Sequence, residues 1–203
     1  MLSKKQRLLK RSFDVSFSAI GIVLCFLPIL LLIVIATIST KKFGIFKQER
    51  IGKDGISFFI YKIRTMTKGS STIKFTLITD PRITKVGHFL RKTRLDELPQ
   101  LFNIVKGDMS FVGPRPDVKG YADLLEGEDR IILSVRPGLT GPATLRFKDE
   151  DALLSNVANP IEYNDTVIWP QKVAINRKYI TNWSFYNDIK YIILSIFPKF
   201  GNF

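Results

Sequence analysis

Cysteine and histidine are nearly absent from this sequence of 203 residues, which contains one of each, Cys25 and His88. A single cysteine excludes an internal disulfide framework and a zinc site built from several cysteines. A single histidine excludes a histidine cluster, and no serine and aspartate lie at the local spacing of a hydrolase triad. Intrinsic disorder is also excluded, because 45% of the residues are hydrophobic and can form a core.

Acidic residues are the second shortage. The chain has 18 Asp and Glu against 31 Lys and Arg, which gives a formal net charge of +13. An excess of this size predicts a partner that carries negative charge. Nucleic acid, anionic lipid and a phosphorylated substrate all meet that requirement, so the charge does not choose among them.

Apolar residues are concentrated near the N-terminus. Residues 1–11 contain five basic residues and no acidic one, and residues 15–40 are 26 residues without a charge, of which 16 are Val, Ile, Leu or Phe. At about −0.3 to −0.6 kcal/mol each, those 16 favour membrane insertion by roughly −5 to −10 kcal/mol. The run is therefore predicted to lie in lipid. At its boundary, Asp14 is expected either to pair with Arg11 on a helix face or to be solvated among headgroups.

Three topologies are compatible with this run. A cleaved signal peptide fits least well, because the run is too long and lacks a small-residue cleavage site. A single helix across the membrane is the simplest alternative. A hairpin is the third, because Pro28 divides the run into halves of about 20 Å, shorter than the ~30 Å hydrocarbon core. Basic residues flank both ends of the run, which suits two ends on the cytoplasmic side.

The rest of the chain, residues 41–203, predicts an irregular α+β domain of short elements. Residues 56–63 are rich in β-branched and aromatic residues and predict a strand. Hydrophobic periodicity predicts helices over residues 83–92, 96–105, 117–134, 176–183 and 185–197. The last of these is amphipathic and fits either the core or the membrane interface.

Two adjacent carboxylates, Asp96 and Glu97, lie at the start of one predicted helix. They suit a capping role, because Asp is a good N-cap and Glu stabilises a first turn. A functional role is the alternative, because a helix N-terminus also favours phosphate and many basic residues are near in sequence. Such surroundings should lower the pKa of a carboxylate, which suits a nucleophile or a ligand for a hard cation. The basic residues are Arg82, Lys85, Arg91, Lys92 and Arg94.

Arg115 lies between two prolines, Pro114 and Pro116, which stiffen the backbone on either side of it. A guanidinium in a stiff loop suits bidentate recognition of phosphate. The alternative is a solvated arginine in a surface turn. Further on, Asp149 and Asp151 fit the D-x-D pattern by which some glycosyltransferases hold a metal-bound nucleotide sugar, although a solvated loop is the simpler interpretation.

Five motifs occur along nearly the whole chain in the order seen in bacterial sugar transferases. The sequence therefore resembles a small monotopic phosphoglycosyl transferase, of the kind that begins the assembly of lipid-linked glycans. Two positions differ from the usual pattern, because Leu27 precedes Pro28 in place of serine and Arg94 stands in place of a small polar residue. The motifs are KRSFD at 10–14, YKIRTM at 61–66, LDELPQLFN at 95–103, GDMSFVGPRP at 107–116 and RPGLTG at 136–141.

The resemblance implies the transfer of a phosphosugar from a UDP-sugar to polyprenyl (undecaprenyl) phosphate, which gives a polyprenyl diphosphate sugar and UMP. It implies a ping-pong reaction in which Asp96 is the nucleophile and carries the phosphosugar covalently. It also implies that Glu97 binds Mg2+ as the cofactor. By the same resemblance, the substrate-binding residues are Lys62, Arg64, Arg91, Pro114, Arg115 and Pro116.

The implied architecture has two parts. Residues 1–40 would form a basic N-terminus and a re-entrant membrane helix that breaks at Pro28. Residues 41–203 would form a catalytic domain on the cytoplasmic face of the bacterial inner membrane, with interfacial amphipathic helices, phospholipid as a partner and no nucleic acid. Two other functions stay open at this point: a membrane-tethered basic binding module, and a metal-dependent glycosyltransferase that uses Asp149 and Asp151.

Overall fold

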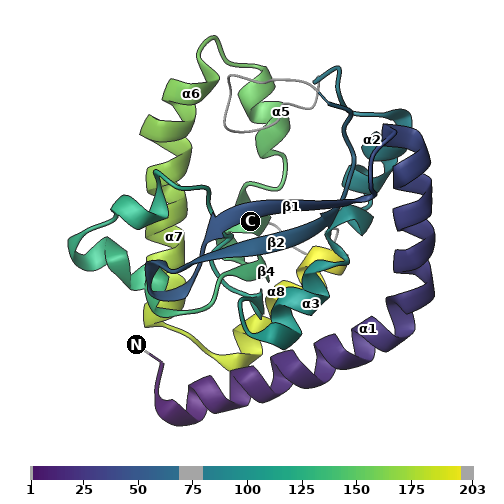
Figure 1. The fold of residues 1–203 in the computed structure, drawn as a ribbon. Helices are drawn as coiled ribbons and strands as arrows, with labels where there is room; N and C mark the ends of the chain where they lie inside the picture. Colours follow the sequence, from purple (N-terminus) through teal and green to yellow (C-terminus); the bar gives the residue numbers. More distant parts are fainter. Residues whose placement is uncertain (1, 69–79, 198–203) are drawn as a thin grey trace.

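The computed structural model describes residues 2–68 and 80–197, which form an α+β domain held against one long N-terminal helix (Figure 1). The α+β class predicted from the sequence is confirmed. The helices are α1 (Lys4–Thr40), α2 (Lys85–Lys92), α3 (Gln100–Lys106), α4 (Pro142–Arg146), α5 (Glu150–Ser155), α6 (Pro160–Tyr163), α7 (Trp169–Thr181) and α8 (Phe185–Ile196). The strands are β1 (Ile45–Ile51), β2 (Ser57–Ile63), β3 (Ser110–Val112) and β4 (Gly138–Thr140).

Helix α1 contains the whole apolar run. Ser3 begins it with a capping box, in which the Ser3 side chain accepts from the Gln6 backbone and the Gln6 side chain accepts from the Ser3 backbone. The helix continues through Pro28 and bends, so that one part runs below α3 and the other rises beside α2 (Figure 1). The expected helix-break-helix is therefore a bend in a continuous helix, because a proline removes one backbone hydrogen bond and adjacent turns can hold the helix together.

Both parts of α1 pack on the same domain. In the first part, Ile22 packs on a cluster that contains Leu101 and Ile104 of α3. In the second part, Ala36 is fully buried with Ile63 and Leu90. The opposite side of the helix exposes large apolar side chains, among them Val23, Leu24, Leu27 and Ile38, each more than 70% exposed. By length and composition, α1 is the one helix in the described ranges that could cross a membrane.

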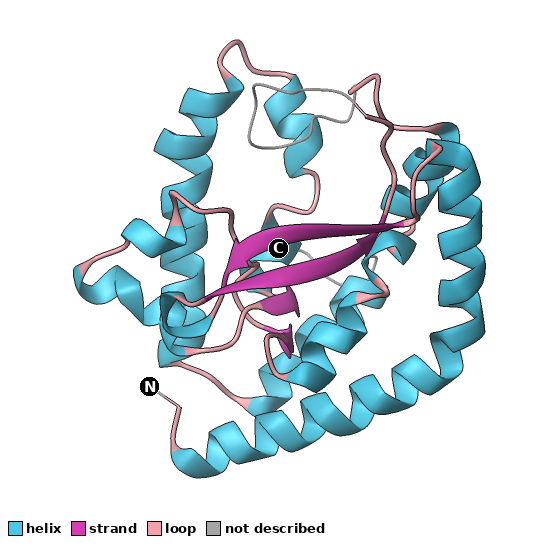
Figure 2. Cartoon of the chain, in the orientation of Figure 1, coloured by secondary structure: helices cyan, strands magenta, loops and turns pink. Residues whose placement is uncertain are grey.

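Two small sheets lie at the centre of the domain (Figure 2). Strands β1 and β2 form an antiparallel hairpin in which Ile45 pairs with Ile63 and Ile51 pairs with Ser57. Strands β3 and β4 are parallel and very short, and they approach closely at two glycines: a side chain at Gly138 would lie 2.1 Å from the Gly113 backbone nitrogen. The predicted strand over 56–63 is confirmed as β2.

Most predicted helices are confirmed with changed bounds, and one is wrong. The helices expected over 83–92 and 185–197 are α2 and α8, and the one over 176–183 is the end of α7. The helix over 96–105 is divided into a 3-10 turn, η2 (Leu95–Glu97), and α3. The range 117–134 holds only the 3-10 segments η3 (Ala122–Leu124) and η4 (Gly127–Ser134), because Gly120 and Gly127 adopt φ of 100° and 56° and interrupt an α-helix.

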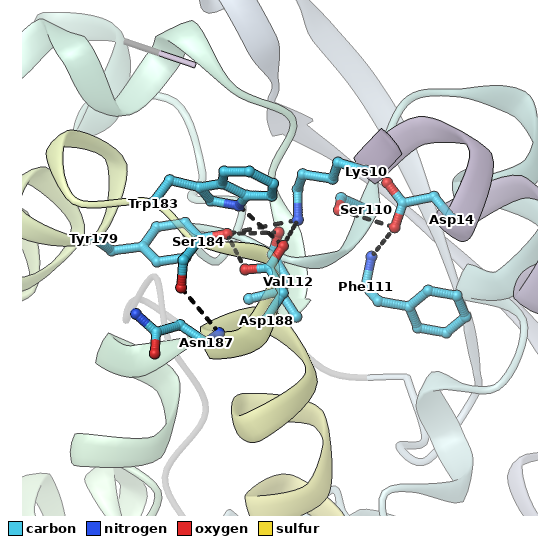
Figure 3. Close-up of polar contacts among 10 residues, drawn as sticks. All are labelled: Lys10, Asp14, Ser110, Phe111, Val112, Tyr179, Trp183, Ser184, Asn187 and Asp188. Carbon is cyan, nitrogen blue, oxygen red and sulfur yellow. Dashed lines mark hydrogen bonds and ion pairs between the residues drawn. The ribbon is translucent and has the colours of Figure 1, made fainter. Parts of the chain in front are cut away.

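A buried polar network joins the start of α1 to α8 (Figure 3). The Lys10 ammonium lies 2.6 Å from the Asp188 carboxylate, which also accepts hydrogen bonds from the Tyr179 hydroxyl at 2.7 Å and the Trp183 indole at 3.0 Å. Because three donors satisfy this carboxylate, a charged pair can stay in the interior. The division of the chain into residues 1–40 and 41–203 stays a prediction, although α1 does end at Thr40.

Candidate active site

Asp96 and Glu97 form the 3-10 turn η2 directly after α2. Arg94 begins this turn with φ of 59°, the left-handed conformation, and both carboxylate residues are buried. The following helix α3 has Pro99 as its N-cap, without a side-chain capping hydrogen bond. The interpretation of the two carboxylates as caps of this helix is therefore wrong, since neither side chain makes a capping hydrogen bond.

Two cations bind the Glu97 carboxylate. The Lys62 ammonium, from β2, lies 2.8 Å from Glu97 Oε1, and Nη2 of Arg115 lies 2.7 Å from the same oxygen. Burial alone would raise the pKa of Glu97, but the adjacent Arg115 and Lys62 outweigh burial and hold the pKa well below its ordinary value. Glu97 is therefore ionised at neutral pH, as the sequence analysis expected of a carboxylate among cations.

Asp96 differs from its neighbour. Burial raises the pKa of the Asp96 carboxyl above its ordinary value; Lys62 opposes this rise and the charge of Glu97 adds to it. The expected lowering of the pKa is therefore wrong for Asp96, because the effect of burial outweighs that of the nearby positive charges. Asp96 is buried, with Lys62, Arg91 and Arg115 near enough to act on its charge. Within the described residues, its carboxylate accepts no hydrogen bond.

The loop that carries Arg115 is fixed on both sides. Pro114 and Pro116 are buried, whereas the Arg115 side chain is 40% exposed. The Gly138 backbone N–H donates to the Pro114 carbonyl at 2.8 Å, and Arg50 Nη1 donates to the Pro116 carbonyl at 3.2 Å. The solvated-turn alternative is wrong for Arg115, because its guanidinium turns inward and pairs with Glu97.

The remaining predicted basic residues divide into two groups. Arg91, in the last turn of α2, donates to the Thr65 hydroxyl at 3.0 Å, and its charge acts on Asp96. Arg64 lies elsewhere: it donates to the carbonyls of Phe43 and Ile45, just after α1. The structure therefore brings together Lys62, Asp96, Glu97 and Arg115, with Arg91 beside them, but does not place Arg64 there. Lys85, Lys92 and Arg94 are exposed, and Arg82 pairs with Asp80.

Sequence reasoning missed a set of charged residues next to Arg115. Burial, with the nearby charge of Arg115, lowers the pKa of Arg50 to about 10. Burial raises the pKa of Asp117 to about 6. Lys172 of α7 forms an ion pair of 2.6 Å with Glu150 of α5, and the Glu150 charge acts on Arg115. The signal for Arg50 was its place in the basic segment after the apolar run, which was assigned to the membrane flank.

The D-x-D residues are not gathered with other acidic side chains into a cluster of metal ligands in the described structure. Asp149 and Asp151 are exposed, and the residue between them is paired with Lys172. In residues 2–68 and 80–197, no group of three or more His, Cys, Asp or Glu side chains is arranged to hold a metal ion.

The donor set around Glu97 fits a different kind of metal binding. Both ion pairs of Glu97 use Oε1, which leaves the second carboxylate oxygen without a cation among the described residues. Mg2+ is commonly held by one or two carboxylates together with substrate phosphates and water. Glu97 is buried and ionised, Asp96 beside it accepts no hydrogen bond, and Arg115 can bind phosphate, so the residues present fit this kind of Mg2+ site.

The fold and the site define a class: a protein with one long apolar helix against a domain that holds a buried carboxylate pair beside a lysine and an arginine. The chain belongs to the bacterial sugar transferase family, whose model matches residues 5–201. The resemblance carried by the five motifs is therefore confirmed.

Named relatives support the same family. The chain is 32% identical to a UDP-galactose-lipid carrier transferase of Erwinia amylovora, over 94% of this chain and 40% of that protein. It is 37% identical to a UDP-glucose:undecaprenyl-phosphate glucose-1-phosphate transferase of Escherichia coli K12, over 99% of this chain and 42% of that protein. It is 35% identical to an uncharacterized sugar transferase, EpsL, of Bacillus subtilis, over 93% and 86% of the two chains. The chain thus spans less than half the length of the first two relatives.

Proposed function

We propose that this protein transfers a phosphosugar from a UDP-sugar to undecaprenyl phosphate, with a polyprenyl diphosphate sugar and UMP as the products. The observation that carries the proposal is the available, buried carboxylate of Asp96 beside an ionised Glu97 that holds Lys62 and Arg115 in place. The activities for which the relatives from Erwinia and Escherichia are named support this class of donor and acceptor. The reaction would be the first membrane step of glycoconjugate biosynthesis.

The proposed chemistry has two displacements at phosphorus. First, a carboxylate oxygen of Asp96 attacks the sugar-bearing phosphorus of the donor, the bond from that phosphorus to the UMP oxygen breaks, and UMP leaves with the electron pair. Second, a phosphate oxygen of the lipid attacks the same phosphorus, and the Asp96 carboxylate is released. Lys62, Arg91 and Arg115 supply positive charge to both steps.

Glu97 is the proposed ligand of Mg2+, through the carboxylate oxygen that the two cations do not use. The ion would neutralise the donor diphosphate and make UMP a better leaving group. For the protein itself, the consequence is that Glu97 has two tasks, because it also orients Lys62 and Arg115.

The proposed topology is monotopic, with a re-entrant α1 and the domain on the cytoplasmic face of the bacterial inner membrane. Its support is that both parts of α1 contact one domain, while the apolar residues around the bend point away from it. A straight helix across the bilayer would carry its second half away from Ile63 and Leu90. Phospholipid, rather than nucleic acid, is the proposed partner of the basic flanks, and the exposed Tyr186, Ile193 and Ile196 of α8 suit the same interface.

The test is a panel of UDP-sugars with the full chain, undecaprenyl phosphate and Mg2+, read by the nucleotide that is released. Release of UMP supports the proposal. Release of UDP would instead indicate direct glycosyl transfer, the D-x-D alternative, and release of neither nucleotide with every sugar would leave only a binding module. Intact mass measurement after donor is added without acceptor should detect the phosphosugar adduct on wild type and not on Asp96→Asn.

A further inference from the structure

Arg11 of α1 contacts the end of the helix that follows the carboxylate pair. Its Nη1 donates to the Ile104 carbonyl at 2.6 Å and its Nη2 to the Val105 carbonyl at 2.7 Å. These carbonyls belong to the last turn of α3, where backbone acceptors lack the i+4 donors of the helix interior, and the Ile104 carbonyl also accepts from the Gly107 backbone N–H at 3.1 Å. Since α3 begins three residues after Glu97, this contact holds in place the helix that follows Asp96 and Glu97 in the chain.

Asp14, three residues later, contacts the strand that leads to Arg115. Its Oδ1 accepts from the Ser110 hydroxyl at 3.1 Å and from the Phe111 backbone N–H at 3.0 Å (Figure 3). Asp14 is 2% exposed, and the pairing with Arg11 expected from the sequence is replaced by these two hydrogen bonds. Strand β3 ends at Val112, so the contact holds the segment that runs directly into Arg115.

Other contacts also dock α1 on the domain. The helix is already held by the Lys10–Asp188 pair and by apolar packing of Ile22 and Ala36. Burying a carboxylate costs free energy unless it accepts hydrogen bonds. The Asp14 carboxylate accepts them from β3, so α1 and β3 must lie in one particular alignment. Two adjacent turns of one helix thus contact the two segments that must meet at Glu97.

We propose that Arg11 and Asp14 are positioning residues, through which α1 sets the placement of Arg115 relative to Asp96 and Glu97. Displacement of reacting groups by about 1 Å can cost on the order of 100-fold in rate, so contacts of this kind can control turnover without touching the substrate. The catalytic consequence rests on the proposed function. The structural consequence, a fixed register of β3 and α3, does not.

The experiment compares four variants of the full chain in lipid nanodiscs. Asp14→Ala removes the acceptor, and Asp14→Asn keeps an acceptor oxygen for Ser110 and Phe111. Arg11→Ala removes both donors to α3. The matched control is Ser18→Ala, because Ser18 is fully buried one turn further along α1 and its hydroxyl bonds only to carbonyls of its own helix.

Two readouts are taken: amide hydrogen exchange of the peptides that contain 104–109 and 110–116, and UMP release. We expect Asp14→Ala to speed exchange in 110–116 at least tenfold and to lower kcat at least tenfold, with Asp14→Asn within threefold of wild type. We expect Arg11→Ala to speed exchange in 104–109 and to lower kcat likewise. Ser18→Ala should change neither readout by more than threefold.

The proposal is overturned if Asp14→Ala and Arg11→Ala match Ser18→Ala in both readouts, or if exchange rises while kcat is kept. If Asp14→Ala does not fold in a thermal melt, Arg11→Ala decides, since that side chain is only half-buried. If wild type itself releases no UMP, the proposed function fails. In that case exchange still reports whether the two contacts hold β3 and α3, and unchanged exchange would overturn the positioning role as well.

Discussion

Two buried clusters of carboxylates and cations in this molecule differ in how completely their charges are satisfied. At the contact of α1 with α8, Asp188 accepts from Lys10, Tyr179 and Trp183. At the candidate active site, Glu97 forms ion pairs with Lys62 and Arg115. Asp96 forms none in the described structure, although the same two cations act on its charge. A satisfied cluster contributes to the fold, whereas a cluster with one unengaged carboxylate has a group free for chemistry. Substitutions in the two clusters should therefore affect different properties, activity in one and stability in the other.

The largest expected effect is the loss of activity in Asp96→Asn. An amide cannot act as the proposed nucleophile, so UMP release should fall by about 10⁴-fold or more. The same change removes a buried charge that has no described hydrogen bond, so the thermal midpoint should stay the same or rise. Enzyme assay and calorimetry on the same sample check both parts. Normal turnover by Asp96→Asn would refute the covalent mechanism.

The opposite pattern is expected for Asp188→Ala. Removing this carboxylate leaves the buried Lys10 ammonium without its partner, and the free energy of unfolding should fall by about 3–5 kcal/mol. Chemical denaturation measures the loss. The protein that remains folded should keep its kcat within a few-fold, and a loss of kcat with unchanged stability would remove the distinction between the two clusters.

Glu97→Gln should affect both properties to an intermediate degree. The amide keeps the shape of the side chain but leaves Lys62 and Arg115 without a counter-charge, and it is a weaker metal ligand. We expect kcat to fall by roughly 100-fold, equivalent to about 2.7 kcal/mol, and the Mg2+ concentration for half-maximal activity to rise. A variant with a lower kcat at an unchanged Mg2+ requirement would show that Glu97 orients the cations without binding the metal.

Asp117 provides a prediction about pH. Its pKa of about 6 lies above the ordinary value of 3.8, so between these values the folded protein binds more protons than the unfolded chain. Stability contributed by this group is therefore present at low pH and is lost as pH rises from about 4 to 6. Asp117→Asn should remove that loss and raise the free energy of unfolding at pH 7 by about 1–2 kcal/mol. Denaturation at pH 4.5 and pH 7 checks the sign; an equal effect at both would contradict it.

Features of the fold and of the candidate site could be predicted from the sequence where neighbouring residues in the chain define them. Residues 95–103 and 107–116 marked Asp96, Glu97 and Arg115 as functional because the motifs carry them, and the structure brings these residues together. The contact of Arg50 with Pro116 joins positions 66 residues apart and has no local signature. Strands β3 and β4 have three residues each, too few for a period to be recognised.

The pKa of Asp96 shows why electrostatics was the hardest property to predict. Counting basic neighbours along the chain suggested that both carboxylates would be strongly ionised. In the fold, Glu97 forms the ion pairs and its pKa is lowered, whereas burial raises the pKa of Asp96. Which neighbour receives the ion pairs is decided by side-chain direction in a single 3-10 turn, and residue spacing does not reveal it.

The smallest expected effect concerns Arg94, at the start of that turn. Its φ of 59° is unfavourable for a residue with a side chain, and glycine adopts it without strain. Because glycine also gains more freedom in the unfolded chain, Arg94→Gly should stabilise the protein by only about 0.5 kcal/mol. Arg94 is exposed, and in the described structure its side chain makes no ion pair with Asp96 or Glu97. We therefore expect kcat and the donor KM to stay within twofold of wild type. A donor KM raised by tenfold in this stabilised variant would instead show that the Arg94 guanidinium contacts the substrate. Arg94 would then join Lys62, Arg91 and Arg115 as a fourth cation of the candidate active site.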